Sequence, residues 1–265
     1  RGRKCAFRGV LELTFEDGTR QLYGTDTLNW KAGVAGPVKH AAIYDGEEYD
    51  AREESGYMSL EKSGVPEINN EFCGEILPSS GAEVYLLKDM TLKPVESYVW
   101  SGVEGASGDE YGKVVVRRTY APGDKITLEP GDTLVVDFGQ NAAAVPSFIF
   151  KAAEGTVLTC LPGEVLNDGN GALNRGMDGP EGSVHRKNLR AHKSGMRVDY
   201  IFGPQKGFVS YCPTRTYFGY RYLSITVTGR TIIKSIESVP VSSLTSAHQT
   251  GWLTTGNDDV NRLIS

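Results

Sequence analysis

The segment from residue 44 to residue 54 carries the densest set of side chains that could contact a ligand. Acidic residues are interspersed there with two tyrosines and one arginine. Carboxylates accept hydrogen bonds from sugar hydroxyls, arginine donates them, and an aromatic ring offers a flat apolar face. The candidate carbohydrate-binding residues are Asp45, Glu47, Tyr49, Asp50 and Arg52. Oxygen ligands of this kind also suit calcium, so Asp45 and Asp50 are candidate metal ligands. A solvated turn in which Asp50 pairs with Arg52 is the alternative interpretation.

A second polar group follows an apolar stretch at residues 133–138. It comprises Asp137, Gln140 and Asn141, and Glu164 follows one predicted strand later. Polar side chains beside the flexible Gly139 are well suited to bond backbone groups at a strand end, which predicts a structural or interdomain role. Glycoside hydrolysis needs two carboxyls roughly 5 to 10 Å apart. Nothing in the spacing brings Asp137 and Glu164 together as such a pair.

Short alternating strands must position these residues. Residues 11–15 alternate apolar and acidic or hydroxyl side chains, Asp17 and Gly18 supply a turn, and residues 21–23 return, which predicts a hairpin with one buried face. Further strands are expected at 84–87, 97–100, 114–116, 133–138, 147–151, 156–161, 198–202, 208–211 and 220–227. With 32 glycines and 12 prolines, the pattern favours an all-β fold of two antiparallel, jelly-roll-like β-sandwich domains.

Three regions are expected along the chain. Residues 1–82 form a partial amino-terminal sandwich that could bind carbohydrate, and residues 83–240 form a second sandwich with a long insertion near 168–187. Residues 241–265 form a linker and a short helix, because Asn257 can cap a helix whose first turn holds Asp258 and Asp259. A helix this short is marginal alone, so we expect it to begin a helical domain.

Composition excludes several function classes. The net charge of −5 disfavours nucleic acid, and no apolar run is long enough to span a membrane. The four cysteines and four histidines are too scattered for a zinc site, a redox pair or a catalytic triad. We expect buried cysteines and surface histidines.

Several segments in order resemble the bacterial α-L-rhamnosidase family. They are the segment Ile43–Glu53, then Val136–Asn141, Gly163–Leu166, Asn188–Arg190, Tyr217–Tyr222 and finally Gly251–Leu263. Two departures concern the second sandwich, where Ala142 to Pro146 replace a small pair and a tryptophan, and Phe218 replaces a commoner histidine. The family consists of large glycoside hydrolases in which β-sandwich domains precede a helical catalytic toroid, and some of its amino-terminal sandwiches bind rhamnose with calcium.

The resemblance implies an accessory function for this chain. The family's catalytic carboxylates belong to the toroid, so no catalytic residue is carried over and this segment alone is expected to be inactive. Its partners would be a rhamnose-containing glycan or glycoside and its own downstream catalytic domain, with no cofactor required other than calcium. A periplasmic or extracellular location is expected rather than a cytoplasmic one. A free-standing rhamnose-binding or adhesion module is the alternative.

Overall fold

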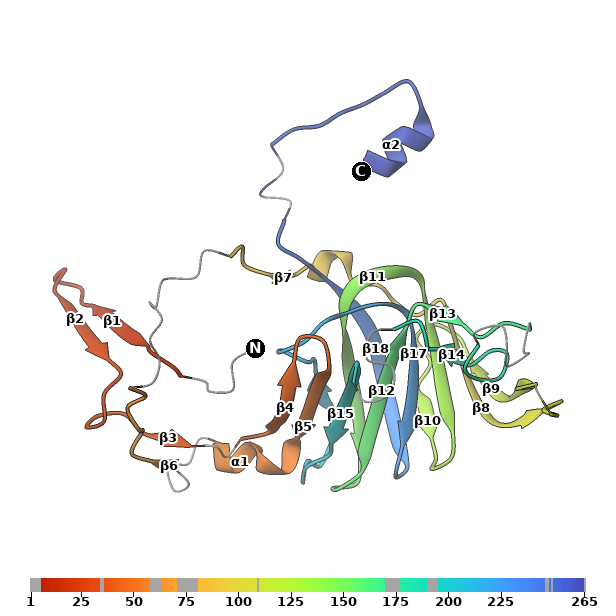
Figure 1. Ribbon diagram of the computed structural model, residues 1–265, viewed down its shortest axis with the longest axis horizontal. Helices are drawn as coiled ribbons and strands as arrows, with labels where there is room; N and C mark the ends of the chain where they lie inside the picture. The colour runs from red at the N-terminus through yellow and green to blue at the C-terminus, as the bar shows by residue number, and fades with distance from the viewer. Residues whose placement is uncertain are drawn as a thin grey trace. The chain divides into compact units, whose positions relative to one another are not determined.

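The structure is a computed structural model dominated by β-strands (Figure 1). It describes residues 6–33, 36–57, 63–70, 81–108, 110–169, 177–189, 195–245, 248 and 250–264. Cys5, Cys73, Arg190 and the middle of the expected insertion, residues 170–176, lie outside the described residues. The all-β prediction is confirmed. None of the described helices is long and apolar enough to cross a membrane.

The chain divides into two compact units, the first of which comprises Arg1–Pro37 and Arg52–Ser80. Its elements are β1 (Val10–Thr14), β2 (Arg20–Gly24), β3 (Ala32–Gly33), β6 (Ser63–Gly64) and α1 (Glu54–Tyr57). The predicted hairpin is present, with Leu11 opposite Tyr23 and a turn in which Gly18 has a φ of 82°. Its expected buried face is not observed, because all ten strand residues are exposed.

The second unit comprises Val38–Ala51 and Gly81–Ser265. Residues 38–51, which the sequence analysis assigned to the amino-terminal sandwich, therefore belong to the second unit. Its main sheet contains β4 (Val38–Ala42), β5 (Gly46–Asp50), β7 (Tyr85–Leu86), β8 (Glu96–Glu104), β9 (Lys113–Tyr120), β10 (Ile126–Leu128), β11 (Thr133–Ala152), β12 (Val157–Gly163), β15 (Arg197–Ile201), β16 (Val209–Tyr211), β17 (Phe218–Val227) and β18 (Thr231–Ser242). A small ribbon pairs β13 (Val165–Leu166) with β14 (Val184–His185). A 3-10 turn, η1 (Ala51–Glu53), follows β5, and another, η3 (Lys88–Met90), follows β7.

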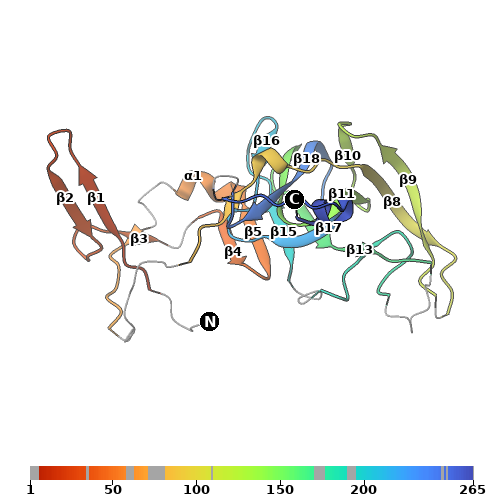
Figure 2. The same cartoon turned by 90° about the horizontal axis from the view of Figure 1, so that it is seen from above.

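The central strand is β11, which arches over the second unit (Figure 1). Its first part pairs with β8 and β17, and its last part pairs with β16 and β18. One sheet is thereby folded over itself, with β8 and β9 at one side of this unit and β4 and β5 at the other (Figure 2). Among the strands that the structure describes, β5 and β15 alone pair in parallel, from Gly46 opposite Arg197 to Asp50 opposite Ile201.

Apolar and aromatic residues of alternating strand positions fill the space that this fold encloses. Phe148, Phe150, Tyr200 and Phe202 are at most 2% exposed, and the Phe150 ring centroid lies 4.8 Å from those of both Tyr200 and Phe202. Cys160 belongs to the same core. Side chains at alternate positions of β11 and β15 form this core, and Val135 and Asp199 between them are buried as well.

A short helix, α2 (Asp258–Ile264), ends the described chain. The Asn257 Oδ1 atom accepts hydrogen bonds from the backbone N–H groups of Asp259 at 2.9 Å and Val260 at 3.3 Å. Asn257 is therefore the N-cap, and the sequence-based prediction of this helix is confirmed.

Candidate functional site

Residues 46–50 of the acidic segment form strand β5 of the main sheet, and residues 43–45 before them form a turn. Glu47 is only 2% exposed, and its carboxylate accepts hydrogen bonds from the Tyr211 hydroxyl at 2.8 Å, the Thr214 N–H at 3.1 Å and the Arg215 N–H at 2.9 Å. These donors supply the hydrogen bonds that a buried carboxylate needs. Burial and the adjacent Glu47 raise the pKa of Tyr211 above its usual range. Glu47 therefore ties β5 to the loop after β16, and the structure does not place it where a sugar could reach it.

Other candidates of this segment have different surroundings. Tyr49 is half-buried and stacks on Tyr200 with ring centroids 5.6 Å apart, while Asp50 is buried and Arg52 is exposed. Asp45 is partly exposed and directly precedes β5. Of the predicted sugar-contacting residues in the second unit, Asp45 is thus the most accessible carboxylate.

The two predicted calcium ligands are separated by the length of β5. Asp45 lies in the turn before β5, and Asp50 is the last residue of β5. With a rise of about 3.3 Å per strand residue, the four steps from Gly46 to Asp50 alone span roughly 13 Å. Their carboxylates cannot share one ion. No group of three or more metal-binding side chains occurs in the described part of the chain.

Asp137 forms an ion pair at the end of the first part of β11. Its two carboxylate oxygens accept hydrogen bonds from Nε and a terminal nitrogen of Arg221, both at 2.8 Å, and Oδ1 also accepts the Gly139 N–H at 2.6 Å. Burial acts to raise the pKa of Asp137, but the bonds from Arg221 and Gly139 outweigh it, and the net pKa is lowered. Asp137 is therefore ionised at neutral pH and unsuited to be a general acid.

The backbone irregularity beside Asp137 explains where the neighbouring polar residues lie. Five steps along β11, from Asp137 to Ala142, correspond to two along β17, from Tyr222 to Tyr220. The additional residues form a bulge in which Gly139 adopts a φ of 75°, and Gln140 and Asn141 are exposed on it. Among the described residues Gln140 makes no hydrogen bond.

Glu164 is the centre of an exposed polar cluster formed with two asparagines. Its Oε1 accepts a hydrogen bond from the Asn141 amide at 3.2 Å, and its Oε2 accepts one from the Asn188 amide at 3.3 Å. Three separate segments of the sequence thus meet at one carboxylate. The cluster offers acceptors and amide donors at the surface, which is a suitable arrangement for hydrogen bonds to a partner domain or to sugar hydroxyls.

The described end of the long insertion is held by a buried network that sequence reasoning missed. Nδ1 of His185 lies 3.0 Å from the Asn167 Oδ1 and 3.1 Å from the Asp178 Oδ1. Burial acts to raise the pKa of Asp178, but the Arg186 N–H and the Asn167 amide donate to it and the net pKa is lowered. His185 is only 7% exposed, contrary to the expectation of surface histidines. These contacts fasten the segment around β14.

Arg221 and the Glu47 donors were also missed by sequence reasoning. Arg221 lies in the segment Tyr217–Tyr222, and as the one cation of that strand it was a recognisable candidate partner for Asp137. Tyr211, Thr214 and Arg215 lie 164 to 168 residues from Glu47, and no local pattern indicates that contact.

The second unit is an antiparallel β-sandwich whose polar strand ends are braced by side-chain hydrogen bonds, and comparison with known families agrees with this class. Residues 126–242 match the model of the bacterial α-L-rhamnosidase concanavalin-like domain. Residues 1–70 match the α-L-rhamnosidase N-terminal domain. The chain belongs to the bacterial α-L-rhamnosidase family.

Similar proteins carry the same family assignment. An α-L-rhamnosidase of Alteromonas sp. is 26% identical over 83% of this chain and 19% of its own length. The crystal structure of an Aspergillus terreus rhamnosidase covers 96% of this chain and 24% of that one, with a TM-score of 0.59 and 21% identity. The structure of a Streptomyces avermitilis α-L-rhamnosidase complexed with L-rhamnose covers 88% of this chain and 19% of that one, with a TM-score of 0.57 and 22% identity. These structures support the fold, and the chain spans about a fifth of the length of the curated relatives it matches.

Proposed function

We propose that this chain is the accessory β-sandwich region of an enzyme that hydrolyses terminal α-linked L-rhamnose from glycans or glycosides. Its task is to position the substrate and to support a helical catalytic domain. The observation that carries the proposal is the hydrogen bonding of the two carboxylates Asp137 and Glu164. Asp137 is neutralised by Arg221, and Glu164 is held between two amides, so both act as braces of strand ends.

The exposed Glu164 cluster is the surface that would contact the catalytic domain. Asn141, Glu164 and Asn188 come from three segments and present both donors and acceptors, so a partner surface can form several hydrogen bonds there without reorganising the cluster. Substrate contact at the same cluster would use the same groups.

An assay on an aryl α-L-rhamnoside tests the division of labour. The 265-residue chain is compared with the same chain joined to the helical domain that the proposal requires. We expect aglycone release only from the joined protein. Release by the short chain above the uncatalysed rate would refute the accessory role.

A Glu164→Gln substitution tests the docking role, with the sandwich region and the helical domain produced separately for binding and joined for activity. Gln keeps the size of the side chain but replaces one of the two acceptor oxygens with a donor NH₂ group. That group would face the donor NH₂ group of Asn141 or Asn188, so one hydrogen bond of the cluster would be lost. We expect weaker association of the two parts when they are produced separately and mixed, measured by titration calorimetry. An unchanged affinity together with lost activity would instead indicate a direct part in the reaction.

Rhamnose and calcium binding at the 45–52 segment is retained in the proposal for Asp45, since Glu47 and Asp50 are buried. Calorimetric titration with rhamnose, with and without calcium, compares the parent with Asp45→Ala. Equal heats in both proteins would remove Asp45 from the proposal. We further propose a periplasmic or extracellular location, where glycan polymers are accessible, and cell fractionation tests it.

A further inference from the structure

A basic pocket lies on the second unit, outside the polar clusters described above. It is an open hollow of about 280 Å³, lined by Lys151, Ala152, Gln205, Lys206, Gly207, Arg230 and Ile232. Three of these seven side chains are cationic and none is acidic. We propose that this pocket binds an anionic saccharide, in which a carboxylate or a sulfate ester is carried by a hydroxylated sugar ring. The inference goes beyond rhamnoside hydrolysis and does not depend on it.

Strand register explains why the cations gather here. Lys151 follows the buried Phe150 on β11, so its side chain points away from the core, and it stands opposite Ile232 of β18. Lys206 belongs to the loop between β15 and β16, and Arg230 belongs to the turn between β17 and β18. One strand and two connections of the sheet therefore contribute one positive charge each.

Most of this charge is not compensated by the protein. Arg230 has an exposed partner in Glu129, at 3.5 Å. Lys151 and Lys206 form no ion pair with a carboxylate of the described residues. A third lysine, Lys234, lies beside the pocket with its Nζ 6.0 Å from the Phe208 ring centroid, and Lys151 approaches the same ring to 4.9 Å. A local positive potential within a chain of net charge −5 attracts anions to this face in particular.

Gln205 adds a requirement that a simple anion cannot meet. Its Oε1 atom has no hydrogen-bond partner and is buried, so a ligand reaches it when the amide turns toward the pocket. A buried acceptor favours a ligand that brings a donor, and a sugar hydroxyl is such a donor, whereas a phosphodiester backbone carries none. The exposed ring of Phe208, 39% accessible, provides an apolar surface next to it. A ligand that combines an anionic group, a hydroxyl donor and an apolar ring face is an acidic sugar.

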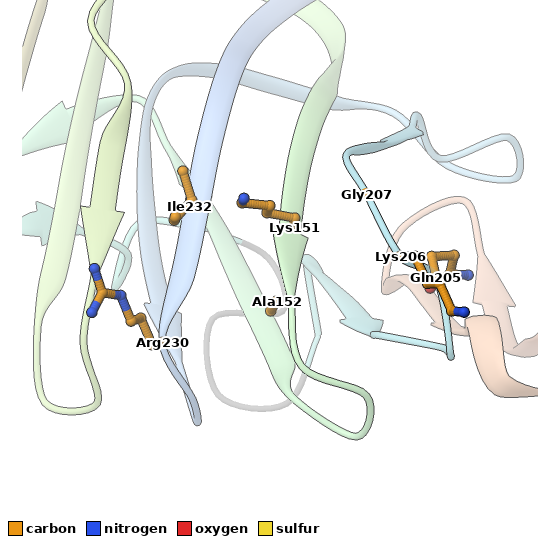
Figure 3. A pocket seen from close by; sticks show the side chains of 7 residues that line it. All are labelled: Lys151, Ala152, Gln205, Lys206, Gly207, Arg230 and Ile232. Atoms are coloured by element: carbon orange, nitrogen blue, oxygen red, sulfur yellow. The ribbon is translucent and has the colours of Figure 1, made fainter.

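The cations are spread along the pocket instead of converging on one point. Figure 3 shows Lys151 in the middle, Arg230 at one side and the loop with Gln205 and Lys206 at the other. A single small anion would contact one of these groups at a time. An oligosaccharide with repeated negative charges can contact several, so we expect affinity to rise with chain length.

Calorimetric titration with trisaccharides tests the inference. The ligands are a galacturonate trimer, a sulfated trimer and the neutral maltotriose, and the two anionic ligands distinguish carboxylate from sulfate recognition. We expect binding of at least one anionic trimer, no detectable binding of maltotriose, and weaker binding as NaCl is raised.

Two triple variants separate the pocket from total charge. One carries Lys151→Gln, Lys206→Gln and Arg230→Gln, and the control carries Lys31→Gln, Lys39→Gln and Lys125→Gln, which removes the same charge at exposed positions elsewhere. We expect at least about tenfold weaker binding in the first and an almost unchanged Kd in the second. Gln205→Leu should weaken sugar binding by roughly threefold to tenfold.

Three results would overturn the inference. They are no heat with either anionic trimer, equal losses in the two triple variants, or a labelled single-stranded oligonucleotide that binds this pocket as tightly as the trimers. Hydrolysis of an aryl rhamnoside, which is neutral, is measured on the same variants joined to the helical domain. Failure of anion binding with intact hydrolysis would reject the pocket while leaving the proposed function in place.

Discussion

Replacing Glu47 should destabilise the second unit strongly, because its carboxylate is buried and accepts three hydrogen bonds. Glu47→Leu leaves the Tyr211 hydroxyl and two backbone N–H groups without an acceptor. A buried donor left unpartnered costs about 1 to 3 kcal/mol, so the expected loss in unfolding free energy is about 3 to 5 kcal/mol after partial access of water to the loop. For a unit of this size the melting temperature should fall by about 10 °C.

Urea denaturation followed by tryptophan fluorescence measures this loss, with equal m-values as the condition for comparing free energies. Glu48→Gln is the matched control, since it removes a carboxylate from the next position, which faces the other side of β5. We expect the control to change stability by less than about 0.5 kcal/mol. If Glu47→Leu were as stable as the control and lost rhamnose binding instead, the structural interpretation of Glu47 would be refuted and the ligand interpretation restored.

Three other experiments test separate features of the fold. Folding lowers the pKa of Asp137, so its ion pair contributes stability above the unfolded value of about 3.9 and loses it as pH falls through the folded value. Asp137→Asn should flatten the fall of the unfolding free energy below about pH 4, and a curve as steep as the parent's would contradict this. Gly46→Ala places a Cβ 1.8 Å from the Arg197 carbonyl oxygen and should cost more than about 3 kcal/mol, whereas Gly123→Ala, with a φ of 92° and open space, should cost about 1 kcal/mol. Equal melting temperatures of the Gly46→Ala and Gly123→Ala variants would show that the backbone at Gly46 moves to relieve the clash. Burial raises the pKa of Cys160 far above its usual value and that of Cys212 to about 11. With Cys5 and Cys73 replaced by serine, iodoacetamide at pH 8 should modify Cys160 only after unfolding. Modified Cys160 in the folded protein, detected by mass spectrometry, would contradict this prediction.

Local patterns were sufficient to predict most of the strands and the final helix. Alternation of apolar and polar residues indicated β8, β12, β15 and β17, and the cap at Asn257 indicated α2. The two expected strands at 133–138 and 147–151 are parts of one strand, β11, because the bulge after Asp137 changes its pairing without ending it. A bulge depends on the neighbouring strand, and the sequence around Gly139 indicates flexibility alone.

The surroundings of the acidic segment could not be predicted for a different reason. Sequence reasoning assigned Glu47 to a ligand-binding loop, with a solvated turn as the alternative, and both place it at the surface. Its burial depends on parallel pairing of β5 with β15, which lies about 150 residues later, and on donors from a loop beyond it. The same limit applies to the basic pocket, since Lys151, Lys206 and Arg230 share no motif and meet only through strand register.

The charged residues of this protein fall into two groups with opposite consequences for binding. Glu47, Asp137 and Asp178 are each matched by several donors, so their charges are already neutralised or hydrogen-bonded and little free energy remains for a ligand. Lys151 and Lys206 have no carboxylate partner among the described residues, and Gln205 has an acceptor without a donor. Groups left in that state gain more from a ligand than groups already paired. Residue type alone pointed to Glu47 and its neighbours as the binding site, and the unmet hydrogen bonds and unpaired charges point to the second group.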